Sequence, residues 1–158
     1  MPGSLTHIMS SPKPSSSLTP SPLTQSQIAD LQHRATEVAH HAYAPYSHFR
    51  VGAALLLDDA ANTIVTGCNV ENASYRLTVC AEQAAIAAAV SLHGPILRIR
   101  ALAVANLNAT ASQPCGACRQ TIHEFSTPDT LIFFPAANNE LTHATIADLL
   151  PAAFLLES

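Results

Sequence analysis

The chain has 158 residues, of which 48% are hydrophobic and 11% charged, and its formal net charge is −4. This length fits one domain with a substantial core, and the low charged fraction favours contacts between subunits. One lysine, Lys13, and six scattered arginines make no clustered basic face, so we expect a small-molecule substrate and no nucleic acid. Four cysteines favour a reducing compartment, and no apolar run approaches the ~20 residues that span a bilayer. We therefore expect a cytoplasmic protein with no membrane partner.

The N-terminal segment differs in composition from the rest of the chain. Seven serines and five prolines make up half of residues 1–24, which predicts a flexible tail followed by one domain over residues 25–158. Thr24-x-x-Gln27 is a capping box and predicts a helix start. The helix should continue to the Pro45 region, because an apolar stripe follows at helical spacing: Ile28, Leu31, Ala35, Val38, Ala39 and Ala42.

The next segments predict two strands and a polar loop. In residues 49–57 one alternating set is apolar throughout and the other contains Arg50, Gly52, Ala54 and Leu56, which indicates a strand with both faces partly buried. Residues 58–62 have the composition of a turn, and residues 64–70 are expected to return as the second strand of a hairpin. The polar run over residues 69–75 then predicts a loop.

The second half of the chain predicts alternating helices and strands. Residues 80–92 are apolar on every side and predict a helix buried all round, residues 99–105 predict a strand, and Pro114 is expected to start a further helix. Residues 131–134 predict another strand and residues 145–150 a short helix. This order indicates an α/β fold, a mixed sheet with helices on its faces, in which both cysteine clusters begin helices. Helix N-termini stabilise thiolates, so this location suits metal ligands.

Two short stretches carry the chemistry: Cys80-Ala81-Glu82 and Pro114-Cys115-Gly116-Ala117-Cys118. Three thiolates can hold zinc and leave one tetrahedral position for a water whose pKa falls to about 7, which leaves Glu82 free to carry protons. The same cysteines would also suit a structural zinc site with Cys68 as fourth ligand, or a redox dithiol. A structural site gives no reason for Glu82 beside the first ligand, so the open catalytic site is favoured.

These motifs resemble those of the cytidine deaminases, in particular the short homotetrameric type with three cysteine ligands. The resemblance covers about residues 43–154 and includes Tyr46-Ser47-x-Phe49-x-Val51-Gly52, the run Asn69-Val70-Glu71-Asn72-Ala73-Ser74-Tyr75, and Arg119-Gln120 after the second cysteine pair. It implies a three-layer α/β/α sandwich with a mixed five-stranded sheet, and a homotetramer with shared active sites.

The resemblance also implies the residue roles. Cys80, Cys115 and Cys118 would bind one Zn²⁺ per chain, and Glu82 would be the catalytic proton shuttle. Asn69 and Glu71 would bind the ribose, Phe49 would pack on the pyrimidine, and Tyr75 and Phe154 would reach a neighbouring subunit's site. Ala73 and Ala81 complete the implied substrate contacts. Around the metal, Arg119 is expected to donate a hydrogen bond to a thiolate, and Gln83 stands where the family usually has arginine.

The function implied is hydrolytic deamination of cytidine and 2′-deoxycytidine, with release of ammonia, in pyrimidine salvage. Two alternatives stay open on the sequence. One is a zinc deaminase of another amino-heterocycle, such as a nucleoside antibiotic or guanine, and the other is a zinc-stabilised binding module without catalysis.

Overall fold

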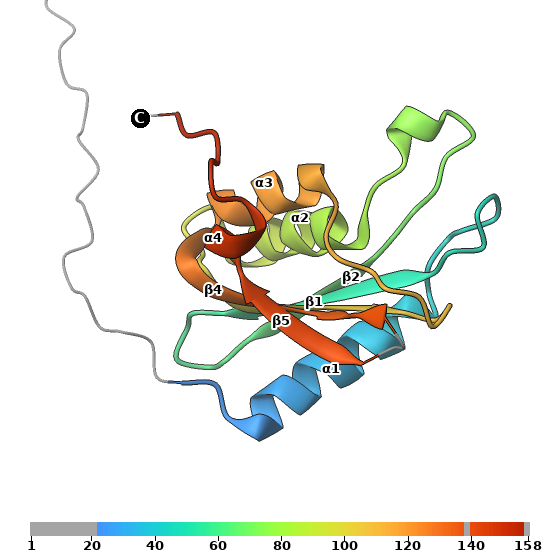
Figure 1. Cartoon of the computed structure of the whole chain (residues 1–158). Helices are drawn as coiled ribbons and strands as arrows, with labels where there is room; N and C mark the ends of the chain where they lie inside the picture. The colour runs from blue at the N-terminus through green and yellow to red at the C-terminus, as the bar shows by residue number, and fades with distance from the viewer. Residues whose placement is uncertain (1–21, 138–139, 157–158) are drawn as a thin grey trace, which may run out of the picture.

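The computed structural model describes residues 22–137 and 140–156 (Figure 1). Most of the tail predicted over residues 1–24 therefore lies outside the described residues. The elements follow one another as α1 (Gln25–Ala39), β1 (Val51–Leu57), β2 (Ile64–Cys68), the 3₁₀ helix η1 (Tyr75–Leu77), α2 (Ala81–His93), β3 (Ile99–Asn106), α3 (Gly116–Glu124), β4 (Ser126–Pro135), β5 (Leu141–Thr145) and α4 (Ile146–Leu149). In this part of the chain, no helix has both the length and the apolar content that crossing a bilayer requires.

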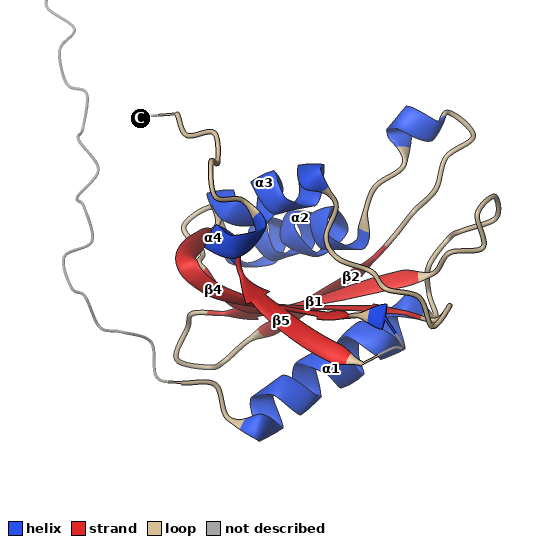
Figure 2. Cartoon of the chain, in the orientation of Figure 1, coloured by secondary structure: helices blue, strands red, loops and turns tan. Residues whose placement is uncertain are grey.

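The five strands form one mixed sheet in the order β2-β1-β3-β4-β5. β1 is antiparallel to both β2 and β3, β3 is parallel to β4, and β5 is antiparallel to β4. Helix α1 covers one face, and α2, α3 and α4 lie on the other (Figure 2). This arrangement confirms the predicted α/β/α sandwich with a mixed five-stranded sheet.

The strand directions explain why the two cysteine clusters meet. Because β2 and β3 are both antiparallel to β1, they run parallel to each other and end at the same edge of the sheet. Helix α2 follows β2, helix α3 follows β3, and both cover the same face (Figure 1). Their N-termini therefore lie side by side, at the edge where open α/β sheets place their ligand sites.

Helix α1 begins where the capping box predicted it. The Thr24 hydroxyl accepts a hydrogen bond from the Gln27 backbone N–H at 3.2 Å, and the Gln27 side chain accepts one from Thr24 N at 3.0 Å. The predicted extension to Pro45 is wrong, because the helix ends at Ala39. Beyond it the chain turns away, and Tyr43 pairs instead with the loop after β2, donating its backbone N–H to Asn69 O at 3.0 Å.

Helix α2 packs on the sheet with one face only, which corrects the expectation of a helix buried all round. Ala85 and Ala89 are fully buried against the sheet, whereas Leu92 is 71% exposed. The close approach on the buried side depends on Gly67 of β2, since a Cβ at this position would overlap the backbone of α2, including Ala84 C at 2.8 Å. The apolar composition of the outer side therefore has no partner within the described part of this chain.

The remaining differences lie at element ends. Helix α3 begins at Gly116, so Pro114 precedes the N-cap and does not start the helix. Strand β4 starts at Ser126, five residues before the predicted strand. The position of β5 was missed, because Leu-Thr-His-Ala-Thr has no clear apolar alternation; it is recognisable only from its pairing with β4.

Candidate active site

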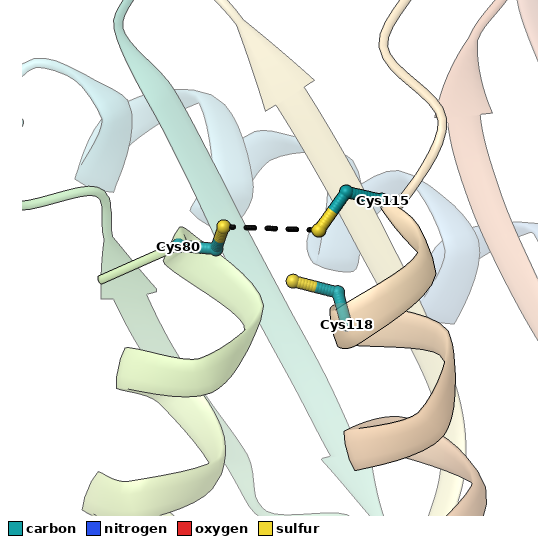
Figure 3. Close-up of side chains that lie close together, drawn as sticks. All are labelled: Cys80, Cys115 and Cys118. Atoms are coloured by element: carbon teal, nitrogen blue, oxygen red, sulfur yellow. Dashed lines mark hydrogen bonds between the residues drawn. The ribbon is translucent and has the colours of Figure 1, made fainter. Parts of the chain in front are cut away.

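Three cysteine sulfurs converge between the N-termini of α2 and α3. Cys80 is the N-cap residue of α2, and Cys115 is the N-cap residue of α3, with Cys118 in the first turn (Figure 3). The three Sγ atoms all lie within 4.8 Å of one another, and those of Cys80 and Cys115 are 4.0 Å apart. Neither N-cap side chain caps its helix. Both sulfurs are therefore free to point into the space between the helices.

This cluster fits zinc in donor type and spacing. Tetrahedral zinc with Zn–S bonds of about 2.3 Å holds its sulfur ligands about 3.8 Å apart, close to the spacing seen. Thiolates are also the donors that select zinc over hard cations. Cys68, the candidate fourth ligand of a closed structural site, is not part of the cluster formed by the described residues. It lies on β2, paired with Gly52, and its burial raises the pKa of its thiol. Three protein ligands leave one position open.

The thiols of the cluster differ in how readily they lose protons. Hydrogen bonding from Cys118 lowers the pKa of Cys80 to about 7, against the opposing effects of burial and the charge of Glu82. The pKa of Cys118 is raised because its proton is held by Cys80, with burial and Glu82 adding to the effect. Of these two thiols, Cys80 therefore loses its proton more readily. A bound cation would favour the thiolate form of all three ligands.

Glu82 is a carboxylic acid placed in a largely apolar setting. It lies in the first turn of α2, two residues after Cys80, and is 5% exposed. Burial raises the pKa of its carboxyl group. Because Cys80 sits at the N-cap rather than inside the helix, residues 80 and 82 line the same cavity, which a regular helix would not achieve at this spacing. A carboxyl group positioned in this way can act as a general base and as a general acid.

The cluster opens into a cavity of about 460 Å³. Three segments of the chain line it: the turn before β1, the loop after β2 with the start of α2, and the end of β3 with the loop after it. The lining residues are Ser47, Phe49, Val51, Asn69, Glu71, Tyr75, Thr78, Cys80, Ala81, Glu82, Val104, Ala111, Ser112, Gln113 and Cys115. Of the residues predicted to contact substrate, five therefore line one cavity with Cys80 and Glu82. Ala73 lies in the adjoining loop, exposed and outside this lining.

Asn69 and Glu71 hold the turn that forms one wall of the cavity. The amide of Asn69, which is 8% exposed, donates to Phe49 O at 2.9 Å and accepts from Val51 N at 2.8 Å. The carboxylate of Glu71 accepts from Tyr46 N at 2.9 Å, from Ser47 N at 3.2 Å and from the Ser47 hydroxyl. The hydrogen bond from Ser47 is the main cause of the lowered pKa of Glu71, so this carboxyl group is ionised at neutral pH.

Two predicted aromatic contacts face outward in this chain. Tyr75 lies at the mouth of the cavity with 89% of its surface exposed. Phe154 is 68% exposed and does not line the cavity of its own chain. Its backbone is nevertheless fixed, because the Gln120 amide donates to Phe154 O at 2.9 Å and accepts from Phe154 N at 3.2 Å. The ring is thus presented outward on an anchored segment.

Arg119 holds the loop before Cys115 in place, mainly through hydrogen bonds to backbone carbonyls. Its guanidinium donates to Pro114 O at 2.8 Å, to Leu149 O at 3.0 Å and to Gln113 Oε1 at 3.2 Å. The expected hydrogen bond to a thiolate is therefore replaced by contacts that hold the residue before Cys115 and the end of α4. Gln83 is half-buried in the first turn of α2.

Sequence reasoning missed the residues that hold others in place. Ser47 contacts Glu71 across 24 positions of the chain, and Gln120 contacts Phe154 across 34. Asn108 accepts a hydrogen bond from Arg50 N and donates one to His48 O, so it fixes the same turn from a third segment. The motifs containing Ser47 and Gln120 were visible in the sequence, but nothing in a motif shows which distant side chain it will contact.

Fold and site together define a class of protein: an α/β/α sandwich with three clustered cysteine sulfurs that could hold a metal ion, beside a buried carboxylic acid. Residues 25–134 match the family model for the cytidine and deoxycytidylate deaminase zinc-binding region, and the chain belongs to this family. The chain is 46% identical over 127 residues to a cytidine deaminase of Mycobacterium tuberculosis, covering 80% of this chain and 89% of that one. It is 44% identical over 116 residues to a cytidine deaminase of Sporosarcina psychrophila, covering 73% and 82%.

Solved structures agree with this assignment. The crystal structure of cytidine deaminase from Mycobacterium tuberculosis matches with a TM-score of 0.70 and 43% identity, over 82% of this chain and 98% of that one. That of cytidine deaminase from Burkholderia pseudomallei matches with a TM-score of 0.72 and 36% identity, over 84% and 100%.

Proposed function

We propose that this protein catalyses the hydrolytic deamination of cytidine and 2′-deoxycytidine to uridine and 2′-deoxyuridine, with release of ammonia. The observation that carries the proposal is the placement of the three cysteine sulfurs, the buried Glu82 and the Asn69–Glu71 loop around one cavity. Family membership and the activity named for the relatives support the same conclusion. Pyrimidine salvage in the cytoplasm is the corresponding cellular role, and residues 25–158 form the catalytic domain.

Cys80, Cys115 and Cys118 would hold one zinc ion per chain. Bound there, zinc would supply a water of lowered pKa as the nucleophile. Exchange of the amino group at C4 for oxygen also needs protons to be moved, and Glu82 is the group placed to move them. It takes a proton from the attacking water and gives it to ring nitrogen N3, and it then takes the second proton of the same oxygen and gives it to the leaving amino group. Burial raises the pKa of this carboxyl group, which makes it a stronger base toward the attacking water.

The walls of the cavity would bind the two halves of the nucleoside. Phe49 supplies an aromatic face for the pyrimidine, and Ala81 allows the ring to approach the first turn of α2. Asn69 and Glu71 would bind the sugar, since Asn69 offers an amide and Glu71 a fixed carboxylate. Ala73 would complete the sugar end of the site from the same loop.

The site would be completed by a neighbouring subunit in a homotetramer. Two observations support this. The side chains of Tyr75 and Phe154 are exposed, and the backbone of Phe154 is held in place by two hydrogen bonds to Gln120. The outward side of α2 and the loop after it add apolar surface, with Leu92 71% and Ile96 96% exposed. Exposed apolar surface of this kind is typical of subunit contacts. Shared sites would arise if these side chains reach the partner's cavity.

The test is loss of the near-ultraviolet absorbance of the amino-pyrimidine, with ammonia measured in the same sample. Zinc-loaded protein should convert both cytidine and 2′-deoxycytidine, with one ammonia released for each nucleoside converted. Turnover of a different amino-heterocycle with no turnover of cytidine would replace the proposed substrate. Zinc content of one per chain without any deamination would indicate a binding module.

A further inference from the structure

The turn over residues 46–50 is held from two sides in a conformation that an isolated peptide would not favour. His48 has a φ of 57°, in the left-handed region that residues other than glycine seldom adopt. Glu71 binds the turn before His48, and Asn69 and Asn108 bind it at and after His48. Such a conformation persists only when its surroundings impose it, so these contacts fix the turn before any ligand arrives.

Ser47 lies at the centre of these contacts, and its hydroxyl has a defined direction. Phe49 N donates to Ser47 Oγ at 3.0 Å, so this oxygen acts as acceptor toward the backbone. The hydroxyl proton is then left to point at Glu71 Oε1, which accepts it. One side chain thus joins the carboxylate proposed for the sugar to the backbone of the residue proposed for the pyrimidine.

The acceptor positions of Glu71 are almost fully used by the protein. A carboxylate has about four acceptor positions, two on each oxygen. Glu71 Oε2 accepts from Tyr46 N and Ser47 N, and Oε1 accepts from the Ser47 hydroxyl. One position remains, on Oε1. The carboxylate is therefore prepared to accept a single hydroxyl donor, rather than a pair of neighbouring hydroxyls.

We propose that Ser47 is the positioning residue that orients Glu71 to read one sugar hydroxyl, and that it thereby sets selectivity at that hydroxyl. The inference rests on the proposed function, in which Glu71 binds the sugar, and it assigns to Glu71 the 3′-hydroxyl, which cytidine and 2′-deoxycytidine share. A single remaining acceptor position also explains why the 2′-hydroxyl need not be read, so that ribo- and deoxyribonucleosides are both substrates. A 3′-phosphate offers no such donor and meets a fixed negative charge.

The kinetic test compares the wild type with Ser47→Ala on cytidine and 3′-deoxycytidine, which lacks the hydroxyl. We expect Ser47→Ala to raise KM for cytidine about tenfold with kcat little changed, and to leave KM for 3′-deoxycytidine nearly unchanged. Ser47→Thr keeps the hydroxyl, and its added methyl group lies on an exposed residue, so it should restore selectivity. Ser91→Ala, the same change at an exposed position of α2, is the matched control and should alter neither substrate. An equal loss for both substrates, or no loss for cytidine, would overturn the proposal.

A second measurement separates this inference from the proposed function. The pKa of the Glu71 carboxyl group, followed by carbon NMR in wild type and Ser47→Ala, does not depend on turnover. Ser47 is the largest cause of its lowering from 4.5, ahead of the backbone N–H groups of the turn and the nearby His48, so the pKa should rise in the variant. An unchanged pKa would show that Ser47 does not hold Glu71, whatever the enzyme turns over. If the pKa rises in a protein that does not deaminate cytidine, the contact between Ser47 and Glu71 is confirmed, but the proposed substrate and the proposed selectivity are both wrong.

Discussion

Replacing Arg119 by lysine separates two roles that an arginine beside a metal site could have. Lysine keeps the positive charge but loses the planar fork that donates to three acceptors at once. Two of these acceptors are the backbone carbonyls of Pro114 and Leu149, and Pro114 is fully buried next to the proposed ligand Cys115. If Arg119 acts mainly through its charge, Arg119→Lys should behave like the wild type. The observed contacts favour the other outcome.

The magnitude follows from the hydrogen bonds that a lysine side chain cannot make. A buried acceptor left without its donor costs about 1–3 kcal/mol. Lysine can reach one of the two carbonyls but not both together with Gln113. We therefore expect Arg119→Lys to lower the free energy of unfolding of the zinc-free protein by about 1–4 kcal/mol and to speed the release of zinc from the loaded protein.

The assay is urea denaturation under reducing conditions at a fixed protein concentration, with zinc release to a coloured chelator measured separately. Gln113→Ala is the matched control, because it removes only the exposed third hydrogen bond and should cost less than about 1 kcal/mol. An Arg119→Lys protein with unchanged unfolding and unchanged zinc release would refute the reasoning. That result would mean that Arg119 acts mainly through its positive charge.

Three further predictions follow from the site and its packing. Glu82→Gln should retain zinc and fold but lose about 10²–10⁴-fold in kcat, and near-normal turnover would remove Glu82 from the mechanism. Gly67→Ala should destabilise the protein by about 1–3 kcal/mol in thermal or urea unfolding, because the added Cβ overlaps the backbone of α2. Gly116→Ala is the control, since no atom lies within 4 Å of the added Cβ, and it should not destabilise the protein. Equal effects of the two substitutions would contradict the close packing at Gly67. Phe154→Ala should weaken substrate binding, and mixing it with Glu82→Gln chains under subunit exchange should restore some sites; strictly additive activity of the mixture would argue against shared sites.

The parts of the structure that depend on local chemistry could be predicted from the sequence. The start of α1 follows from Thr24 and Gln27, which lie three residues apart and satisfy each other's backbone groups. The placement of Cys80 and Cys115 near helix starts follows from the apolar run that begins at Cys80 and from Pro114 directly before Cys115. These features need only neighbours in the chain, so a short stretch of sequence contains all the information.

The parts that depend on distant partners could not be predicted. Helix α1 ends at Ala39, before the proline, because Tyr43 finds its pairing partner in the loop after β2. The contacts of Arg119 with Leu149 and of Ser47 with Glu71 join segments 30 and 24 positions apart. The exposed outer side of α2 was expected to be buried because composition reports apolar character, not which surface covers it.

The location of the site follows from the register of the sheet. Gly52 of β1 is paired with Cys68 at the end of β2, and Val51 is paired with Asn106 at the end of β3. The turn before β1, the loop after β2 and the loop after β3 therefore meet at one edge, although they come from three separate parts of the chain (Figure 1). The first contributes Phe49, the second Glu71 and Cys80, and the third Cys115.

Because these segments share one edge, the same few hydrogen bonds position the residues proposed to bind substrate and those proposed to act on it. Asn69, just after β2, binds the backbone of Phe49 and Val51 on both sides of Arg50. Asn108, after β3, binds the backbone of the alternate residues, His48 and Arg50. A slip of β1 by one residue would reverse the direction of every side chain on the strand and would also break these bonds. The register is thus specified twice, by the buried faces of β1 and by the polar contacts at its start. The position of Phe49 relative to Cys80 is set by the same contacts that set the fold.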